Sequence, residues 1–200
     1  MLLAGLGAYL LWPAPTLDAG RLDAALPTQH DLHGFVPYDG LTGSLKVPPA
    51  NKKGRAVLSG HRLAAQCRKW RADGDGWACR QVHGVGMVVL ERSQNVFFRV
   101  LSNVLAYDGE GAAEDGWDGL VADIRRKTAD NEDIHERPAE LGDESRAFKG
   151  AGVTVLAIRT GTVVVEATVW DGDGTVTRAD QDAMVEKWPA LQLSKIGEQL

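Results

Sequence analysis

The sequence predicts an α+β fold in which an antiparallel sheet built from hairpins carries helices packed on one face, as a two-layer sandwich. Two pairs of β-branched and aromatic segments, within 85–107 and 153–170, are each joined by a short turn, as in antiparallel hairpins. Single helical segments separate these pairs, so the regular strand–helix–strand alternation of a parallel sheet is missing. The 200 residues are 44% hydrophobic and 24% charged, which suits one globular domain that buries a core.

Residues 1–15 are expected to be a signal or membrane-anchor remnant. They contain the uncharged run MLLAGLGAYLLW, closed by two prolines. The run is too short to cross a bilayer, which takes about 20 apolar residues, but it suits the apolar part of a signal peptide. No Lys or Arg precedes it, so a buried helix of a soluble domain is the other interpretation.

Residues 16–55 are expected to form a short helix and an irregular segment that leads into the domain. TLDAGRLDAAL places Leu22 and Leu26 four residues apart, with Asp18 as a candidate helix cap. Prolines and glycines break up the rest. Residues 56–200 are then the α+β domain.

The first half of this domain should contain a helix followed by a hairpin. Leu63, Cys67 and Trp70 recur at i, i+4 and i+7, on one face of a helix. VGMVVLE (85–91) and NVFFRVLSNVLAY (95–107) follow as two strands separated by three residues.

The clearest amphipathic helix is expected over 109–127. Its apolar residues Trp117, Leu120, Val121 and Ile124 recur at i, i+3, i+4 and i+7. Acidic residues crowd the first turns and basic residues the last, which matches the helix dipole. We therefore interpret the acidic run as dipole matching and solvation.

A second hairpin and a last helix complete the domain. VTVLAIR (153–159) and TVVVEATVW (162–170) bracket a Thr-Gly turn. The last helix opens at TRADQDAMVEKW, where Thr177 and Asp180 have the spacing of a capping box. Pro189 should kink or interrupt this helix.

The charge is unevenly distributed. Residues 1–106 carry 12 Lys/Arg against 7 Asp/Glu, and residues 107–200 carry 10 against 20. The acidic second half argues against nucleic acid as a partner, because phosphate binding needs clustered cations. The basic cluster consists of Lys52, Lys53, Arg55, Arg62, Arg68, Lys69 and Arg71. It is either a solvated face or a contact with anionic membrane or cell-wall polymer.

Cys67 and Cys79 are the only cysteines. A zinc site needs about four ligands, and no His lies between the two cysteines. A redox pair normally has two intervening residues, whereas this pair has eleven. A disulfide closing a loop of roughly 13 residues is the more coherent interpretation, because the intervening ADGDG favours a turn. Two unbonded buried thiols are the alternative.

No motif selects a catalytic or cofactor site. Asp171 and Asp173 in WDGDGT lack the later residues of a calcium-binding loop, so a turn is expected there. No serine sits in GxSxG, and no GxGxxG follows a strand. The five histidines do not form a ligand set, although His30 and His33 are close in sequence. We therefore expect no catalytic residue, metal or cofactor.

Trp70, Trp77 and Trp170 flank the cysteines or a turn. They are our candidate lining of a ligand cleft, because ligand pockets are rich in aromatic side chains. Packing over the disulfide is the alternative interpretation.

Several phrases resemble actinobacterial secreted or membrane-anchored sensor-type domains. LDAALPTQHDLHGFVP is similar to their opening, and GDESRAF, VLAIRTGTVVVEATVW and the closing helix to their second half. The group includes the extracellular domain of membrane serine/threonine kinases of the PknH type. The resemblance implies an α+β sandwich with a cleft for an extracytoplasmic ligand, and no catalytic residues. Those kinase domains have two disulfides, whereas this chain can form only one.

These observations predict a non-catalytic, extracytoplasmic ligand-binding or interaction domain that is secreted or anchored to the membrane. Its partner would be a small molecule, a cell-wall or lipid ligand, or another protein, and the amino terminus is a candidate membrane tether. A secreted hydrolase using a carboxylate pair is the second hypothesis, since 27 acidic residues offer many pairs. A cytoplasmic domain with reduced cysteines is the third.

Overall fold

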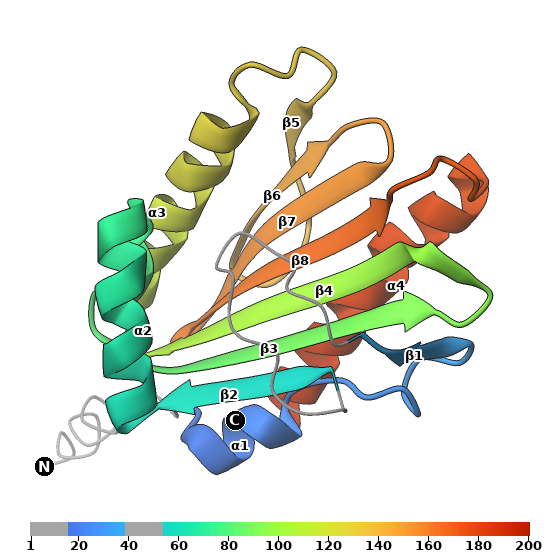
Figure 1. The fold of residues 1–200 in the computed structure, drawn as a ribbon. Coiled ribbons are helices and arrows are strands. Elements are labelled where there is room, and N and C mark those ends of the chain that lie inside the picture. Colours follow the sequence, from blue (N-terminus) through green and yellow to red (C-terminus); the bar gives the residue numbers. More distant parts are fainter. Residues whose placement is uncertain (1–15, 39–53) are drawn as a thin grey trace, which may run out of the picture.

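The computed structural model describes residues 16–38 and 54–200, and Figure 1 shows their arrangement. The helical elements of this part are α1 (Ala19–Ala24), α2 (Gly60–Asp73), the short 3₁₀ helix η2 (Gly76–Cys79), α3 (Glu110–Thr128) and α4 (Arg178–Gly197). The strands are β1 (Phe35–Pro37), β2 (Arg55–Ser59), β3 (Val82–Arg92), β4 (Asn95–Tyr107), β5 (His135–Pro138), β6 (Glu144–Lys149), β7 (Val153–Thr160) and β8 (Val163–Asp171).

All eight strands belong to one sheet, and each pairs antiparallel with its neighbours. The order is β1-β3-β4-β8-β7-β6-β5, and β2 pairs with β3 beside β1. Strand β3 is long enough for β1 to pair with Leu90–Arg92 while β2 pairs with Gly84–Val88. The predicted α+β class and the antiparallel sheet built from hairpins are confirmed.

Both predicted hairpins are present at the centre of this sheet. Strands β3 and β4 pair along most of their length, as do β7 and β8. The turn of the second hairpin lies at Gly161 and Thr162, one residue later than expected. Gly161 has a φ of 54°, a conformation that glycine adopts without steric cost.

The sequence pattern does not predict β1, β2, β5 or β6. Strand β5 has no apolar alternation because all four of its residues, HERP, are exposed. It forms only because its backbone pairs with β6 at the edge of the sheet. Such pairing depends on distant residues and leaves little trace in local sequence.

Helices cover both faces of the sheet (Figure 1). On one face, α2 and α3 pack on a core that includes Met87, Leu101 and Val164. On the other, α1 and α4 pack on a core that includes Val88 and Val165. The expected layer of helices on one face is present, and α1 and α4 add a layer that the sequence did not predict. Because successive strand residues point to opposite faces, burial on both faces explains the nearly continuous apolar runs in β3 and β8.

The predicted helix caps and apolar faces agree with the structure. The Asp18 carboxylate accepts hydrogen bonds from the backbone N–H groups of Gly20 and Arg21, which caps α1. The Thr177 hydroxyl accepts one from Asp180 N, at 3.1 Å, at the start of α4. The predicted face of α3 is buried, with Trp117, Leu120, Val121 and Ile124.

Of the two expected effects of Pro189, a kink or an interruption of α4, the interruption does not occur. It continues from Arg178 to Gly197 with Pro189 inside it. Proline in a helix interior costs about 3 kcal/mol because it removes a backbone donor and crowds the preceding turn. Packing offsets that cost here, since Trp188 and Ile196, on either side of Pro189, are almost completely buried against the sheet.

Candidate functional site

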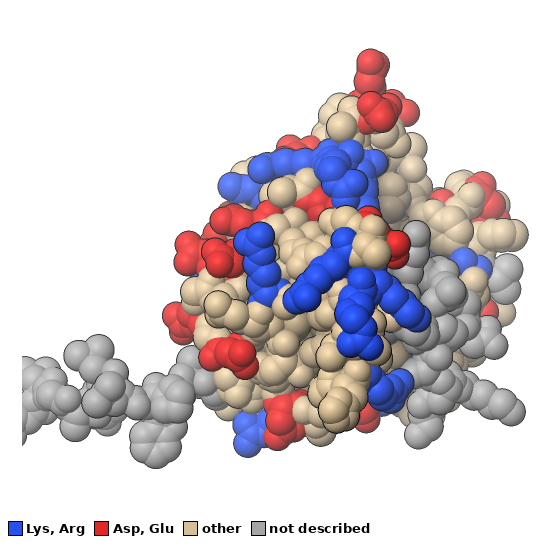
Figure 2. Space-filling model, turned by 60° about the vertical axis from the view of Figure 1, so that its left-hand side comes forward, with Lys and Arg blue, Asp and Glu red and all other residues tan. Residues whose placement is uncertain are grey.

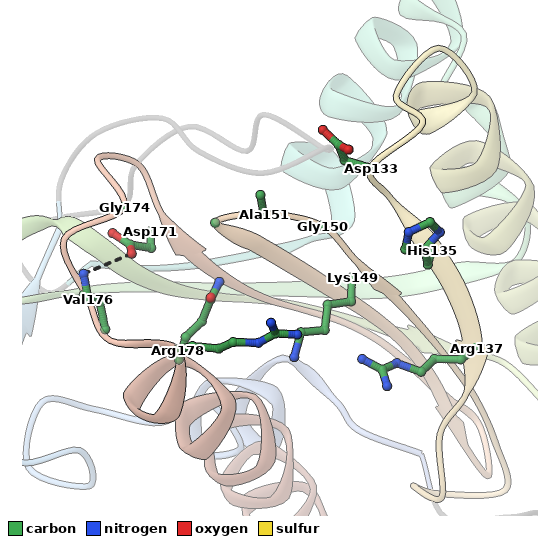
Figure 3. A pocket seen from close by; sticks show the side chains of 12 residues that line it. Asp133, His135, Arg137, Lys149, Gly150, Ala151, Asp171, Gly174, Val176 and Arg178 are labelled. Carbon is green, nitrogen blue, oxygen red and sulfur yellow. Dashed lines mark hydrogen bonds between the residues drawn. The ribbon is translucent and has the colours of Figure 1, made fainter.

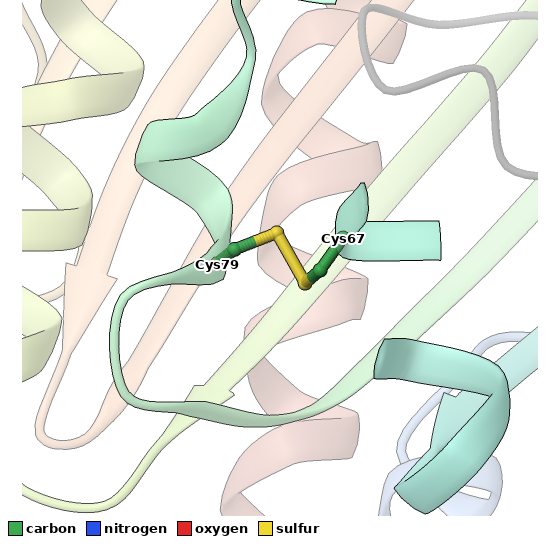
Figure 4. The surroundings of a disulfide bond; sticks show 2 residues. All are labelled: Cys67 and Cys79. Atoms are coloured by element: carbon green, nitrogen blue, oxygen red, sulfur yellow. A yellow bond between two sulfur atoms is a disulfide. The ribbon is translucent and has the colours of Figure 1, made fainter. Parts of the chain in front are cut away.

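The predicted disulfide between Cys67 and Cys79 is present (Figure 4). The two Cα atoms are 5.6 Å apart. Cys67 lies on α2 and Cys79 ends η2, so the bond fastens α2 to the segment that leads into β3. A disulfide is consistent with an oxidising location outside the cytoplasm, because cytoplasmic thiols are normally kept reduced.

The three candidate cleft tryptophans lie in two different places. Trp70 is 1% exposed, inside the core beneath α2. Trp77 packs against the same core and contacts α3, where a Cβ at Gly119 would lie 2.8 Å from the Trp77 Cβ. Trp170 lies on β8 and is 36% exposed. Trp70 and Trp77 therefore lie in or against the core cluster that also includes Cys67 and Cys79, and Trp170 is separate from them.

Trp170 belongs to a cluster around Arg99. The Arg99 guanidinium carbon lies 3.9 Å from the centre of the Tyr38 ring and 5.0 Å from that of Trp170. Arg99 also faces Glu91, with 3.5 Å between Nε and Oε2. A cation beside two aromatic rings is attracted by their electron-rich faces. This cluster connects β4 and β8 to the residue that follows β1.

A groove lies between α4 and strands β5–β7, and we call it the α4 groove. It consists of two cavities, of about 700 and about 530 Å³, that share Arg137 and Lys149 in their walls. The larger cavity lies at the amino-terminal end of α4 (Figure 3). None of the three candidate tryptophans lines either cavity.

The strand register aims basic side chains into the α4 groove. His135 pairs with Lys149 across β5 and β6, and Arg137 follows two residues later. Because strand side chains alternate, Glu136 points to the opposite face, where it accepts hydrogen bonds from Arg125 of α3 at 2.6 and 2.7 Å. His135 and Arg137 are left facing α4, as Figure 3 shows.

Three cations from three elements converge in the larger cavity. Figure 3 shows the side chains of Arg137, Lys149 and Arg178 pointing toward one another, from β5, β6 and the start of α4. Lys149 forms an ion pair with Asp182. The hydrogen bond from Lys149 lowers the pKa of the Asp182 carboxyl, and the positive charges of Lys149, Arg178 and Arg137 lower it further. Neither arginine forms an ion pair with another described residue.

The same cavity contains buried polar atoms that lack hydrogen-bond partners within the described chain. Asp171 is 5% exposed, and its Oδ2 accepts a hydrogen bond from Val176 N at 3.1 Å. Asp171 Oδ1 has no hydrogen-bond donor. Gln181 is 8% exposed, and its Nε2 has no acceptor. Both residues line the cavity, but these two atoms are themselves buried.

A second carboxylate lies beside Asp171. The pKa of Asp173 is lowered, chiefly by a hydrogen bond from the Thr175 hydroxyl, with a smaller contribution from its interaction with Asp171. Asp173 Oδ1 accepts from both the hydroxyl and the backbone N–H of Thr175. This is the turn expected at WDGDGT. A hydrogen bond that lowers the pKa of Asp173 is one in which Asp173 accepts, so the Asp171 and Asp173 side chains are partners of each other.

Sequence reasoning did not find the residues of this groove. The short segments HERP and ESRAFK supply Arg137 and Lys149 without a recognisable motif, and Arg178 resembles any exposed residue in a first helical turn. For Asp171 the sequence pattern indicates a turn and no ligand site. Nothing in the local sequence indicates that these segments meet.

A separate basic surface lies over α2. Arg62, Arg68, Lys69 and Arg71 are exposed on this helix and form no ion pair with a described residue. Figure 2 shows Lys and Arg side chains gathered on the side of the molecule where α2 and α3 lie. Lys52 and Lys53 of the predicted basic cluster are outside the described residues. A contact of this surface with anionic membrane or polymer stays a prediction.

Two further features concern metals and membranes. Within residues 16–38 and 54–200, no group of three or more His, Cys, Asp or Glu side chains is arranged to hold a metal ion. In the same ranges, no helix combines the length and the apolar character that crossing a bilayer requires. The expected signal or anchor segment, 1–15, lies outside the described residues.

Comparison with known proteins does not assign a family. No protein-family model matches the chain, and a search of curated proteins finds no match. The function must therefore be argued from the chemistry of the α4 groove and from the disulfide.

Proposed function

We propose that this protein is a non-catalytic, extracytoplasmic ligand-binding domain of the sensor type, secreted or tethered to the membrane, and that its ligand binds in the α4 groove. The observation that carries the proposal is the convergence of Arg137 and Arg178 on one cavity, where neither arginine forms an ion pair with a described residue. If this region served stability alone, we would expect carboxylates of the protein to pair with these two arginines.

The extracytoplasmic location is supported by chemistry and by resemblance. The Cys67–Cys79 disulfide favours an oxidising compartment. The GDESRAF and VLAIRT phrases on which the resemblance to sensor-type domains rests lie on the neighbouring strands β6 and β7. Arg159 links them by donating a hydrogen bond from Nε to Glu144 Oε1, at 2.8 Å.

The shape of the groove suits a small ligand. Cavities of about 700 and 530 Å³ are within the range of small-molecule sites. Their walls come from a sheet edge and a long helix that is fastened to the sheet by Trp188, so the site is largely preformed. We therefore favour a small molecule or a polymer fragment over a flat protein partner.

The first experiment is a binding screen on the oxidised protein. We would measure its melting temperature with cell-wall fragments, anionic sugars, anionic lipids and divalent metals, and analyse each mixture for cleavage products. A stabilising ligand that is not consumed supports the proposal. Substrate turnover would instead favour the secreted-hydrolase hypothesis.

A matched pair of double variants then tests the groove. Arg137→Gln with Arg178→Gln should weaken binding at least tenfold, because two converging cations are lost. Arg68→Gln with Arg71→Gln removes the same charge from the surface of α2 and should leave binding unchanged. If the second pair alone abolishes binding, the ligand site is on α2 and the proposal is wrong.

The proposed extracytoplasmic location of the protein can be tested separately. Native protein alkylated at the moment of lysis and analysed by intact mass should carry no label on Cys67 or Cys79, and it should fractionate outside the cytoplasm. Two labelled thiols in a cytoplasmic fraction would overturn the extracytoplasmic part of the proposal.

A further inference from the structure

We propose that the ligand of the α4 groove carries an anionic group, a carboxylate or a phosphate, which Arg137, Arg178 and Lys149 bind together. This inference rests on the proposed function and names the chemical class of its ligand. The three cations line the larger cavity. They come from three different elements, β5, α4 and β6, and Figure 3 shows their side chains converging.

The positive charge at this point exceeds what the described part of the protein neutralises. Asp182 forms an ion pair with Lys149. The hydrogen bond from Lys149 and the charges of all three cations lower the pKa of the Asp182 carboxyl. One carboxylate is therefore shared by three cations, and two positive charges stay unbalanced. An anion placed among cations that repel one another stabilises them.

The other two carboxylates in the wall of the larger cavity do not neutralise the arginines. Asp171 is 5% exposed, and it is bonded to Val176 N, at 3.1 Å, and to the side chain of Asp173. These bonds fix the turn that leads from β8 into α4, and so they help to place Arg178. Asp133 precedes β5 and lies apart from the three cations in Figure 3. Among the described residues, neither carboxylate forms an ion pair with either arginine.

The two arginines suit an oxyanion in both access and geometry. Arg137 and Arg178 are exposed, so a ligand reaches them without any opening of the fold. Each planar guanidinium can donate two parallel hydrogen bonds to a carboxylate or a phosphate. Lys149, whose side chain is 20% exposed, adds a charge from the wall of the groove. The positive end of the α4 helix dipole lies on the same side, because α4 begins at Arg178.

The test uses two matched pairs of probes in isothermal titration calorimetry at low salt. Succinate is compared with succinamide, which has a similar shape and no charge, and glycerol 3-phosphate is compared with glycerol. We expect at least one anion to bind about ten times more tightly than its neutral counterpart, since two exposed arginines contribute about threefold each. The anion that binds more tightly distinguishes a carboxylate ligand from a phosphate ligand.

Arginine variants then locate the bound anion. Arg178→Gln should weaken its binding about threefold, and Arg178→Lys, which keeps the charge but loses the paired donors, should weaken it less. Arg137→Gln with Arg178→Gln should remove the difference between an anion and its neutral counterpart. Arg68→Gln with Arg71→Gln removes the same charge from α2 and should leave every affinity unchanged. Melting temperatures of the unliganded variants establish that they are folded.

Chemical modification gives an independent readout of the site. Phenylglyoxal modifies accessible arginine side chains, and mass spectrometry identifies which of them have reacted. The bound anion should slow the modification of Arg137 and Arg178 severalfold and should not protect Arg68 or Arg71. Equal protection of all four arginines would mean that the anion only screens charge, and the inference would be wrong.

The outcomes distinguish this inference from the proposed function. The inference alone is wrong if neither anion binds more tightly than its neutral counterpart while another molecule of the screen binds in an Arg137- and Arg178-dependent way. The groove then remains a ligand site. If the anions lose affinity only in the α2 variant, or if nothing binds in the groove, the proposed function and this inference fail together.

Discussion

The indole Nε1 of Trp188 donates a 2.9 Å hydrogen bond to the backbone carbonyl of Leu101. Trp188 is the largest fully buried side chain of α4, and Leu101 lies in β4 at the centre of the sheet. A second bond, from Gln192 Nε2 to the Ala25 carbonyl at 2.7 Å, joins α4 to the end of α1. Together they determine where α4 lies, and hence the position of one wall of the α4 groove.

Trp188→Phe should therefore destabilise the protein and weaken ligand binding. It removes a buried hydrogen bond and leaves a small cavity, which together cost about 1–3 kcal/mol of unfolding free energy. Urea denaturation measures this loss. Trp170→Phe, at a half-exposed position on the same sheet, is the control and should cost about 1 kcal/mol or less. Equal losses in the two variants would contradict this role of Trp188.

The disulfide should contribute measurably to stability. Cys67→Ser with Cys79→Ser opens a loop of roughly 13 residues, and the chain-entropy relation then gives a loss of about 3 kcal/mol. Urea denaturation with and without reductant checks this value. Reductant should lower the stability of the wild-type protein to that of the double variant and leave the double variant unchanged. If reductant does not change the unfolding free energy of the wild-type protein, the prediction is wrong.

Gly119 should be intolerant of a side chain. An added Cβ would lie 2.8 Å from the Trp77 Cβ, so Gly119→Ala should force α3 and η2 apart and cost about 1–2 kcal/mol despite alanine's better helix propensity. Gly111, also in α3, has nothing within 4 Å of such a Cβ. Gly111→Ala should be neutral or stabilising by about 0.5 kcal/mol. Thermal unfolding of both variants measures the difference in stability between them. If Trp77 can move away without cost, Gly119→Ala and Gly111→Ala will have similar stabilities, and the prediction will be wrong.

The link between β5 and α3 should make a small, pH-dependent contribution to stability. Hydrogen bonds from Arg125 lower the pKa of Glu136 below its ordinary value of 4.5. A carboxyl with a lowered folded-state pKa stabilises the fold above the unfolded-state pKa, and this contribution is lost as the pH falls through the folded-state pKa. Since the Glu136 side chain is 30% exposed, we expect about 0.5 kcal/mol at pH 7.

Urea denaturation of Glu136→Gln between pH 7 and pH 3 measures this contribution. The variant should be slightly less stable than the wild-type protein at pH 7, and the difference should shrink below pH 4.5. Glu132→Gln, at an exposed position in the preceding loop, is the matched control and should show no such narrowing. If the stability difference between Glu136→Gln and the wild-type protein grew as the pH fell, the prediction would be wrong.

The charge of Asp182 should oppose ligand binding. Its carboxylate neutralises Lys149 and feels the charges of Arg137 and Arg178. Asp182→Asn should therefore raise the affinity for an anionic ligand of the α4 groove about fivefold, which corresponds to about 1 kcal/mol. Calorimetry in low salt measures the change. Asp180→Asn, an exposed change on the same helix outside both cavities, should have a smaller effect, and a loss of affinity in Asp182→Asn would contradict the proposed anion site.

The local elements of this fold were largely predictable. The apolar spacing of Trp117, Leu120 and Ile124 indicated α3, and the β-branched runs on either side of short turns indicated the two central hairpins. Short-range chemistry also indicated the caps at Asp18 and Thr177. Such features depend on residues close in sequence, so periodicity and side-chain type reveal them. The cysteine spacing likewise led to the disulfide.

The amino-acid sequence alone thus determined the fold class, the central strands, the main helices and the covalent link. Only the tertiary structure decided that α1 and α4 cover the second face of the sheet and that Arg137, Lys149, Asp171 and Arg178 meet in one groove. These four residues come from β5, β6, β8 and α4, which are brought together by antiparallel register and by the burial of Trp188. Strand register and burial depend on contacts between segments that are far apart in the sequence. A local sequence pattern therefore does not predict which polar side chains of exposed or edge elements come together.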